Sequence, residues 1–249
     1  MASARYTLNI TPDPPEEHHE MTPQEKRANF WYYNKWKIFA GIAAIVLVSF
    51  FVYDIVSQVD PDYQIGVISR TTLPDSAVEA LETQLATLAD DRNGDGKTVV
   101  SVMTYTLAPA GSEDNAAQVV DAYTQMAGST KLMADAQNGE SMLFLTNDVQ
   151  AYELSEALFA YNDGTAPESE ASLDLARMGV AWADCPQLTA LDLGRVTTMD
   201  GTDAGSVQSI LADYVLVKRV FAGTSLAEKE KAQSYYAASM QLFDRLTAQ

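Results

Sequence analysis

Histidine is almost absent from this chain: its two histidines are His18 and His19. The part after residue 57 has none, so it cannot hold a Ser-His-Asp or Cys-His catalytic site, a histidine-ligated zinc or a His-Glu-x-x-His helix. No pair of carboxylates stands out from the many acidic residues either. We therefore expect a protein without catalytic activity of its own rather than an enzyme.

Cysteine occurs once, as Cys185. A single cysteine excludes a disulfide within the chain. A lone cysteine is more often a small buried apolar residue than a nucleophile, and we expect the former for Cys185.

Basic residues are scarce after residue 57, where 11 Lys plus Arg stand against 28 Asp plus Glu. An acidic surface of this kind repels nucleic acid and anionic lipid headgroups, so we expect no nucleic-acid partner. Its partners would instead be cations or neutral and basic solutes. Solubility outside the cell is a simpler explanation of the same charge.

Charge is missing altogether from the sixteen residues Ile38 to Tyr53. Extended through Val56, this run approaches the ~20 residues that a helix needs to cross about 30 Å of hydrocarbon. We predict a transmembrane helix at 37–57. A cleaved signal peptide fits less well, because a long segment precedes the run and no small-x-small cleavage pattern follows it. A buried core helix fits less well still, because the run is apolar on every side.

The flanking residues predict a single-pass protein of the cell membrane, in contact with the lipid bilayer. By the positive-inside bias, residues 1–36 form a cytoplasmic tail and residues 58–249 an acidic extracytoplasmic domain. The tail is expected to be disordered, since its TPDPPEEHHE stretch is too polar to pack a core. The bases before the uncharged run are Lys26, Arg27, Lys35 and Lys37, and the acids after it are Asp54, Asp60 and Asp62.

Alternating strand and helix patterns predict an α/β fold for the domain. Their order implies a parallel or mixed sheet with helices on both faces. Ser76 to Glu79 matches a capping box, which would start the first helix. The strand patterns cover 63–69, 98–107 and 142–146, and the later helical patterns cover 116–138 and 149–161.

Helical spacing also predicts which side chains are buried. The first helix would bury Val78, Leu81, Leu85 and Leu88. The second would bury Val119, Tyr123, Met126, Thr130 and Met133, and Gly139 would cap its end.

The C-terminal half has weaker patterns. Residues 167–177 are either a helix or an acidic loop, and strands are expected at 180–183, 189–193 and 214–222. A terminal helix is expected at 226–246. Its buried side would consist of Ala232, Tyr235, Ser239, Phe243 and Leu246.

The segment QMAGSTKLMADAQNGESMLFLTND leads from the second predicted strand to the third through a helix that ends in a small-residue turn. This arrangement resembles the first lobe of extracytoplasmic solute-binding proteins. The run DRNGDGKTVVSVMTYTL looks like a segment of uncharacterised bacterial single-pass membrane proteins with such an ectodomain. The resemblance covers residues 62–148 and implies a periplasmic-binding-protein-like lobe. Here a helical span holds the domain, and the chain is short for two full lobes.

Asp91, Asn93 and Asp95 lie in the most motif-like stretch of the domain. With Gly96 they match D-x-[DN]-x-[DN]-G, the first half of a calcium loop. The twelfth position is Val102, where an EF-hand needs a bidentate glutamate, so this is not an EF-hand. A truncated Ca²⁺ loop and a plain Asx/Gly-rich turn both remain open.

Short polar residues follow two of the predicted strands. Ligands of doubly wound sheets bind beyond the carboxyl ends of the strands, where the crossovers diverge. Hydroxyls and amides next to a helix start suit a small polar or anionic solute, although helix capping explains the same residue types. The candidate residues are Ser69, Thr71 and Thr72 after the first strand and Asn147 and Asp148 after the third.

The sequence thus favours a membrane-anchored, non-catalytic extracytoplasmic domain that binds or senses a solute. The alternative is an interaction or assembly subunit of a cell-envelope complex. A cleft lined by Ser69, Thr71 and Asn147 would favour the first reading. The second reading would be favoured if side chains fill the switch point, which is the place where the crossovers from neighbouring strands diverge, and if an apolar patch is exposed on the surface.

Overall fold

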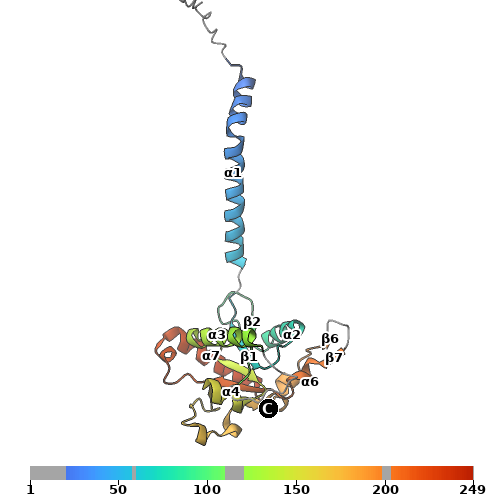
Figure 1. The fold of residues 1–249 in the computed structure, drawn as a ribbon, viewed down its shortest axis with the longest axis vertical. Helices are drawn as coiled ribbons and strands as arrows, with labels where there is room; N and C mark the ends of the chain where they lie inside the picture. Colours follow the sequence, from blue (N-terminus) through green and yellow to red (C-terminus); the bar gives the residue numbers. More distant parts are fainter. Residues whose placement is uncertain (1–20, 58–59, 110–120, 198–202, 249) are drawn as a thin grey trace, which may run out of the picture. The chain divides into compact units, whose positions relative to one another are not determined.

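A computed structural model describes residues 21–57, 60–109, 121–197 and 203–248 of the chain (Figure 1). The chain separates into two compact units, Met1–Gln58 and Val59–Gln249. The predictions made for residues 1–20 of the tail, and for Val119 in the second predicted helix, fall outside the described residues.

The first unit contains one long helix, α1 (Pro23–Ser57). A capping box starts it: the backbone N–H of Glu25 donates to the Thr22 hydroxyl, and the Thr22 N–H donates to the Glu25 carboxylate at 2.8 Å. The stretch Pro23–Val52 is long and apolar enough to cross a membrane, and it is the one such helix among the described residues. The helix therefore begins before the predicted span of 37–57 and takes in part of the predicted tail.

The second unit is a mixed α/β domain built on a six-stranded sheet. The strand order is β2-β1-β3-β8-β4, and β5 also pairs with β8. β1 runs parallel to β2 and β3, whereas β8 runs antiparallel to β3, β4 and β5. The predicted α/β class with a mixed sheet is confirmed. The strands are β1 (Tyr63–Ser69), β2 (Val100–Thr106), β3 (Leu143–Thr146), β4 (Phe159–Ala160), β5 (Val180–Ala181) and β8 (Val215–Arg219).

Helices cover both faces of this sheet, as predicted. Successive strand residues point to opposite faces, so in β3 Leu143 and Leu145 pack on one face and Phe144 on the other. Side chains of α2 and α7 join the first cluster, and side chains of α3 and α4 join the second. The helices are α2 (Asp75–Ala86), α3 (Ala122–Asn138), α4 (Val149–Glu156) and α7 (Glu230–Leu246).

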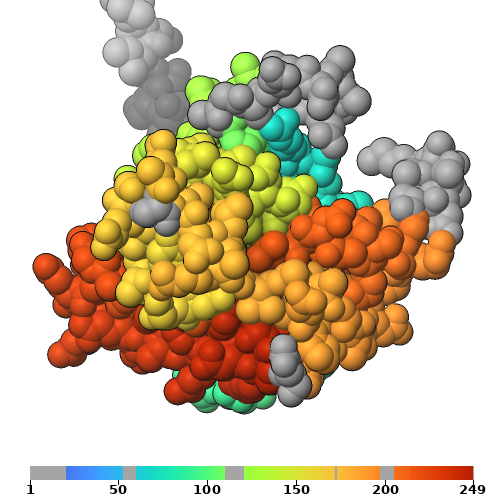
Figure 2. Space-filling view, turned by 90° about the horizontal axis from the view of Figure 1, so that it is seen from below, coloured from blue at the N-terminus to red at the C-terminus, as the bar shows by residue number. Residues whose placement is uncertain are grey.

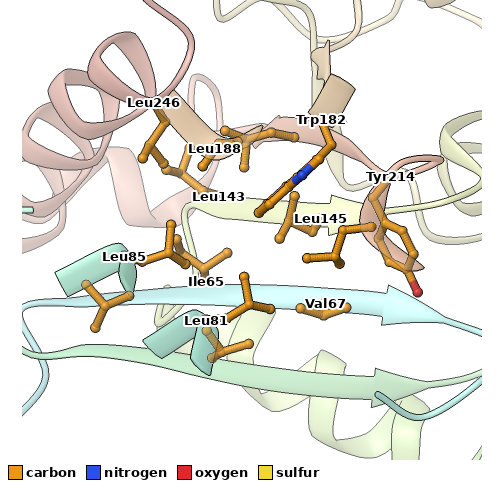
Figure 3. Packing of buried hydrophobic residues seen from close by; sticks show 14 of the residues in the cluster. Ile65, Val67, Leu81, Leu85, Leu143, Leu145, Trp182, Leu188, Tyr214 and Leu246 are labelled. Carbon is orange, nitrogen blue, oxygen red and sulfur yellow. The ribbon is translucent and has the colours of Figure 1, made fainter. Parts of the chain in front are cut away.

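Figure 3 shows the first cluster, in which Leu81 and Leu85 of α2 and Leu246 of α7 pack against the sheet. The predicted stripe of the first helix is confirmed, since Val78 and Leu88 are partly buried beside them. The predicted stripe of the last helix is also confirmed by its fully buried members, which are Ser239, Phe243 and Leu246.

The start of α2 differs from the prediction. The helix begins at Asp75, and Pro74 occupies the N-cap without a side-chain hydrogen bond. Because the helix already includes Ser76, its hydroxyl does not form the predicted capping box with Glu79. The ring of Pro74 instead fixes the φ angle (−59°) of the residue before the helix.

The third helix is shorter than predicted. α4 ends at Glu156, where Ala157 adopts a left-handed conformation (φ 49°). The following residues extend as β4 and pair with β8. Pairing with a strand distant in the sequence overrides the local helical pattern.

The second predicted helix exposes the side that was expected to be buried. On α3, Tyr123, Met126 and Met133 are 77%, 64% and 61% exposed. The buried residues are Gly128, Leu132 and Asp135. The helix is therefore turned about its axis relative to the prediction.

The C-terminal half consists mainly of short elements, and Figure 2 shows the face on which its yellow, orange and red segments lie side by side. The prediction of a strand at 189–193 is wrong, because Thr189 ends the helical turn Pro186–Thr189 and residues 190–193 form a turn and an irregular segment. The expected strands at 180–183 and 214–222 are present in shorter form as β5 and β8. The short elements are η1 (Glu170–Ser172), η2 (Leu175–Arg177), η3 (Trp182–Asp184), α5 (Pro186–Thr189), β6 (Arg195–Thr197), β7 (Asp203–Ser206), α6 (Val207–Leu211) and η4 (Ser225–Glu228).

Cys185 is a buried free thiol, as expected. Its sulfur lies 3.3 Å from the carbonyl oxygen of Ala181, to which the thiol donates. Burial raises the pKa of this thiol, which lowers its reactivity as a nucleophile.

Candidate functional sites

Two clefts lie at opposite ends of the parallel strands. The larger, here called the amino-edge cleft, has a volume of about 570 Å³ and lies where β1 and β3 begin. The smaller, the carboxyl-edge cleft, has a volume of about 530 Å³ and lies where β3 ends. The lining of the amino-edge cleft includes Gln64, Arg92, Glu140, Lys229, Lys231 and Tyr235.

Arg92 is held in place at the amino-edge cleft. Its Nε donates a hydrogen bond of 2.8 Å to the carbonyl oxygen of Asp62. Its guanidinium lies over the ring of Tyr235, 4.8 Å from the ring centre. The terminal guanidinium nitrogens have no hydrogen-bond partner among the described residues, so they are available to a ligand.

Tyr235 joins α7 to the start of the sheet. Its hydroxyl donates to the carbonyl oxygen of Glu140 at 2.7 Å and accepts from the backbone N–H of Gln64 at 2.9 Å. Burial raises the pKa of Tyr235 to about 12, so the phenol keeps its proton at neutral pH. This side chain therefore forms a rigid wall of the cleft.

Asp62 organises the loop that carries Arg92. The carboxylate is fully buried and accepts three backbone hydrogen bonds of 2.8 to 2.9 Å, from Arg92, Asn93 and Val99. Several backbone donors on one carboxylate satisfy a buried charge that would otherwise be costly. The loop between α2 and β2 is thereby tied to the start of β1.

A buried polar cluster centred on Asp135 lies next to the cleft. The carboxylate of Asp135 accepts from Gln64 Nε2 at 3.0 Å, from the backbone N–H of Ser141 at 2.8 Å, and from the hydroxyls of Ser141 and Tyr105. Gln64 belongs both to this cluster and to the lining of the cleft. The cluster fixes the end of α3 against β1 and β2.

Arg219 completes the Asp135 cluster from β8. Its guanidinium donates to the carbonyl oxygens of Asp135 and Ala136 and lies 4.0 Å from the Asp135 carboxylate. Burial lowers the pKa of Arg219 and raises that of Tyr105. The cluster thus pairs a buried cation with a buried anion, and removing either partner would leave an unpaired buried charge.

The predicted calcium residues form a tight turn. The Asp91 carboxylate accepts from the N–H groups of Gly94 and Gly96 at 2.7 and 2.8 Å. Asn93 and Asp95 accept in the same way from backbone N–H groups two positions ahead. The bonds of Asn93 and Asp95 are those of Asx turns. Among the described residues, no group of three or more His, Cys, Asp or Glu is placed to hold a metal ion.

The predicted solute-binding residues do not all converge. The Ser69 hydroxyl is buried and donates to the carbonyl oxygen of Thr71 at 2.5 Å. Thr72 forms a 2.8 Å hydrogen bond with the hydroxyl of Thr106. None of these three predicted residues, Ser69, Thr71 and Thr72, lines the carboxyl-edge cleft.

Asn147 and Asp148 do line the carboxyl-edge cleft. Asp148 also caps α4, since its side chain accepts from the backbone N–H of Ala151 at 3.0 Å. The opposite wall comes from the segment that includes Met178 and Val180. The structure thus brings together two of the five predicted residues at one cleft.

Two tyrosines fill the switch point itself. Tyr214 is 3% exposed, and Ser69 lies within hydrogen-bonding reach of its hydroxyl. Tyr152 is fully buried and donates to the carbonyl oxygen of Leu107 at 2.7 Å. These buried rings take up space at the carboxyl ends of β1 and β2, Tyr214 in the first apolar cluster and Tyr152 in the second, on the opposite face of the sheet.

The outer side of α3, here called the α3 face, is defined by Tyr123, Met126, Ala127, Thr130, Met133, Ala134 and Gln137. Its large members are exposed. Lys131 is the one charged residue of α3 on its solvent side, and its Nζ turns back to the carbonyl oxygen of Thr104 at 3.3 Å. The face is thus exposed and rich in apolar side chains, with Thr130 and Gln137 as its polar members.

Reasoning from the sequence missed both the cations of the amino-edge cleft and the Asp135 cluster. Arg92 and Lys229 are far apart in the sequence, so no spacing rule connects them. Asp135 was the available signal, because an acidic residue within an apolar helix needs either solvent or buried partners.

Comparison with protein-family models, with curated proteins and with solved structures finds no match to this chain.

Proposed function

We propose that the chain is a single-pass membrane protein whose acidic domain docks a protein partner of the cell envelope through the α3 face. The exposed apolar surface of α3 is the observation that carries this proposal. The role is one of binding rather than catalysis, consistent with the lack of histidine after residue 57.

The composition of the α3 face supports docking. Tyrosine and methionine are enriched at protein interfaces, where methionine adapts to irregular partner surfaces. Met126 and Met133 are more than 60% exposed, and they lie two helical turns apart on the same side as Tyr123. Neighbouring apolar side chains on one surface of a soluble domain are typical of interaction sites.

The filled switch point supports the same proposal. Solute capture at that point needs an open space between the crossovers. Tyr152 and Tyr214 occupy this region with less than 4% of their surface exposed. A filled switch point and an exposed apolar face are the combination expected of an assembly subunit.

Site-specific photocrosslinking of the full chain in its own membrane tests docking. A photoreactive residue at position 133 should yield one discrete adduct, whereas the same residue at position 237, exposed on α7, should not. Met126→Lys should abolish the adduct without unfolding the domain, because a surface substitution changes stability by only about 0.5 kcal/mol. An adduct of twice the chain mass would identify the partner as a second copy. Equal labelling at both positions, or none, would refute the proposal.

Solute capture is the second candidate, and the carboxyl-edge cleft favours it. Asn147 and Asp148 line this cleft together, and its size lies within the range of small-molecule sites. In this reading the domain would act as a periplasmic-binding-protein-like lobe. A thermal-shift screen of the full chain in detergent against amino acids, sugars and peptides tests it. A genuine ligand should lose its effect in Asn147→Ala and keep it in Thr72→Ala.

The proposed topology places the N-terminus in the cytoplasm and the domain outside. The four bases before the uncharged run Ile38 to Tyr53 and the three acids after it support this orientation. Protease added to intact cells or spheroplasts should digest the domain and spare the N-terminal tail. Protection of the domain would reverse the orientation.

Calcium binding at Asp91, Asn93 and Asp95 stays a proposal with a direct test. A ligand that binds only the native state raises the melting temperature by mass action. Millimolar Ca²⁺ should therefore raise the Tm of the wild type and leave that of Asp95→Ala unchanged. Equal Tm values with Ca²⁺ and with a chelator would leave the Asx turn as the sole role of this loop.

A further inference from the structure

Three cations gather at the amino-edge cleft of an otherwise acidic domain. Arg92 comes from the loop between α2 and β2, and Lys229 and Lys231 come from the start of α7. These residues are distant in the sequence, and the fold brings them to one cavity. Among the charged residues that line this cleft, cations outnumber acids by three to two, whereas acids predominate in the domain as a whole.

The three cations have no carboxylate partner in the described part of the chain. The ion pairs found there join Arg177 to Asp163, Arg219 to Asp135 and Arg245 to Asp90. None of these pairs uses a cation of the cleft. Arg92 is nonetheless held in position by its Nε hydrogen bond and by the ring of Tyr235.

Acidic residues only partly offset these cations. Asp60 and Glu140 also line the cleft. The Glu140 carboxylate accepts a hydrogen bond of 3.0 Å from Asn138 Nδ2, so part of its acceptor capacity is used. The buried carboxylate of Asp62 is also close to Arg92, but its oxygens already accept hydrogen bonds from the backbone N–H groups of Arg92, Asn93 and Val99. Exposed acids at greater distances contribute little, because the screening length is about 8 Å at physiological ionic strength.

We infer that the amino-edge cleft binds an anion that carries a phosphate group. Guanidinium forks bind phosphate oxygens in a bidentate manner, and lysines add point charges. The ring of Tyr235 and the side chain of Leu226 offer an apolar wall for an uncharged part of the ligand. The volume of about 570 Å³ is that of a small-molecule site.

Two sources could supply this phosphate chemistry. Asp60, which lines the cleft, is three positions in the sequence from Ser57, the last residue of α1. Because α1 is the candidate membrane span, a phospholipid headgroup is one source. A soluble phosphate compound is the other. The proposal is independent of docking at the α3 face, which involves other residues.

Pyrophosphate binding to the full chain in phosphatidylcholine nanodiscs tests the site. Calorimetry should show saturable binding that weakens about tenfold or more in Lys229→Gln/Lys231→Gln, since charge-assisted contacts are lost. The matched control is Lys97→Gln/Lys131→Gln, which removes the same charge outside the cleft and should bind like the wild type. Fluorescence of the buried Trp182 would verify that both variants are folded.

A lipid arm separates the two sources. If the ligand is a headgroup, phosphatidylglycerol in the nanodisc should compete with pyrophosphate, and native mass spectrometry should find it retained by the wild type and lost in Lys229→Gln/Lys231→Gln. If the ligand is soluble, phosphatidylglycerol should not compete. Absence of pyrophosphate binding together with absence of lipid retention would overturn the inference. Equal weakening in both double variants would overturn it too, because attraction to net charge would then explain the binding.

Discussion

The helices α3 and α7 are the same length and lie on opposite faces of one sheet, yet they bury different kinds of surface. Both have 17 residues, and apolar spacing predicts a buried side for each. α7 buries the predicted side, with Phe243 and Leu246 almost fully enclosed. α3 exposes its predicted side and buries Gly128, Leu132 and Asp135 instead. Apolar spacing alone therefore does not decide which side of a helix faces the core.

Close packing explains part of this difference. A Cβ atom on Gly128 would lie 2.4 Å from the carbonyl oxygen of Thr106. The glycine thus lets α3 approach the backbone of β2 more closely than any other residue would allow. The opposite side of α3, with Tyr123 and two methionines, could not approach so closely.

The polar cluster explains the rest. Asp135 finds hydrogen-bond donors on β1, on β2 and on the loop after α3, and a cation on β8. If the predicted side of α3 faced the sheet, the Asp135 carboxylate would no longer reach these donors or the cation. Two neighbouring residues of β8 contact the two helices on opposite faces of the sheet. The Nζ of Lys218 lies 4.2 Å from the ring centre of Phe243 in α7, and Arg219 contacts Asp135 in α3.

The strongest test of the comparison truncates one large apolar residue on each helix. Phe243→Ala should lower the free energy of unfolding by about 3–5 kcal/mol, because it empties a packed site. Met133→Ala should change it by no more than about 0.5 kcal/mol, because the side chain is exposed. Urea denaturation of the full chain in detergent, followed by tryptophan fluorescence, measures both. A large loss in Met133→Ala would mean that the α3 face is buried.

The second test removes one carboxylate from each helix. Asp135→Ala should cost about 3 kcal/mol, because it leaves Arg219 and several donors without their acceptor in the interior. Asp244→Ala, on the exposed side of α7, is the matched control and should be nearly neutral. The same denaturation assay applies. Similar stabilities of the two variants would show that the Asp135 cluster does not orient α3.

The third test exchanges glycine and alanine in opposite directions. Gly128→Ala should destabilise by about 1–2 kcal/mol through the clash with Thr106, even though alanine favours the helix. Ala237→Gly on α7 should cost about 1 kcal/mol from helix propensity alone. A more stable Gly128→Ala variant would show that the close approach of α3 is not required.

The smallest expected effect concerns Lys218, beneath α7. Burial lowers the pKa of Lys218 in the folded state, so the unfolded chain holds this proton more strongly. Stability should therefore rise with pH toward the ordinary lysine pKa near 10.5, by at most about 1.4 kcal/mol per pH unit. Lys218→Met should lack this component of the slope. Parallel pH profiles of wild type and variant, from denaturation midpoints, would contradict the prediction.

The elements that were predicted correctly have strong local signals. β1 matches residue for residue, because its run of apolar and β-branched residues is buried on both faces. The end of α4 and the segment 189–193 were predicted wrongly, because their conformations depend on pairing and packing with distant parts of the chain. Two of the predicted solute-binding residues share a cleft because both follow the same strand. Of the remaining three, Ser69 ends β1, Thr72 bonds to Thr106 of β2, and none of the three lines that cleft.

The sequence by itself determined the apolar helix, the acidic balance of the domain and the alternation of strands and helices, because these depend on composition and short-range spacing. Tertiary structure alone decided the side of α3 that faces the sheet, the filling of the switch point by Tyr152 and Tyr214, and the meeting of Arg92 with Lys229 and Lys231. Each of these depends on groups that are distant in the sequence and close in space. A helix orients to satisfy its buried polar groups and to pack closely, even where this leaves tyrosine and methionine exposed on the α3 face.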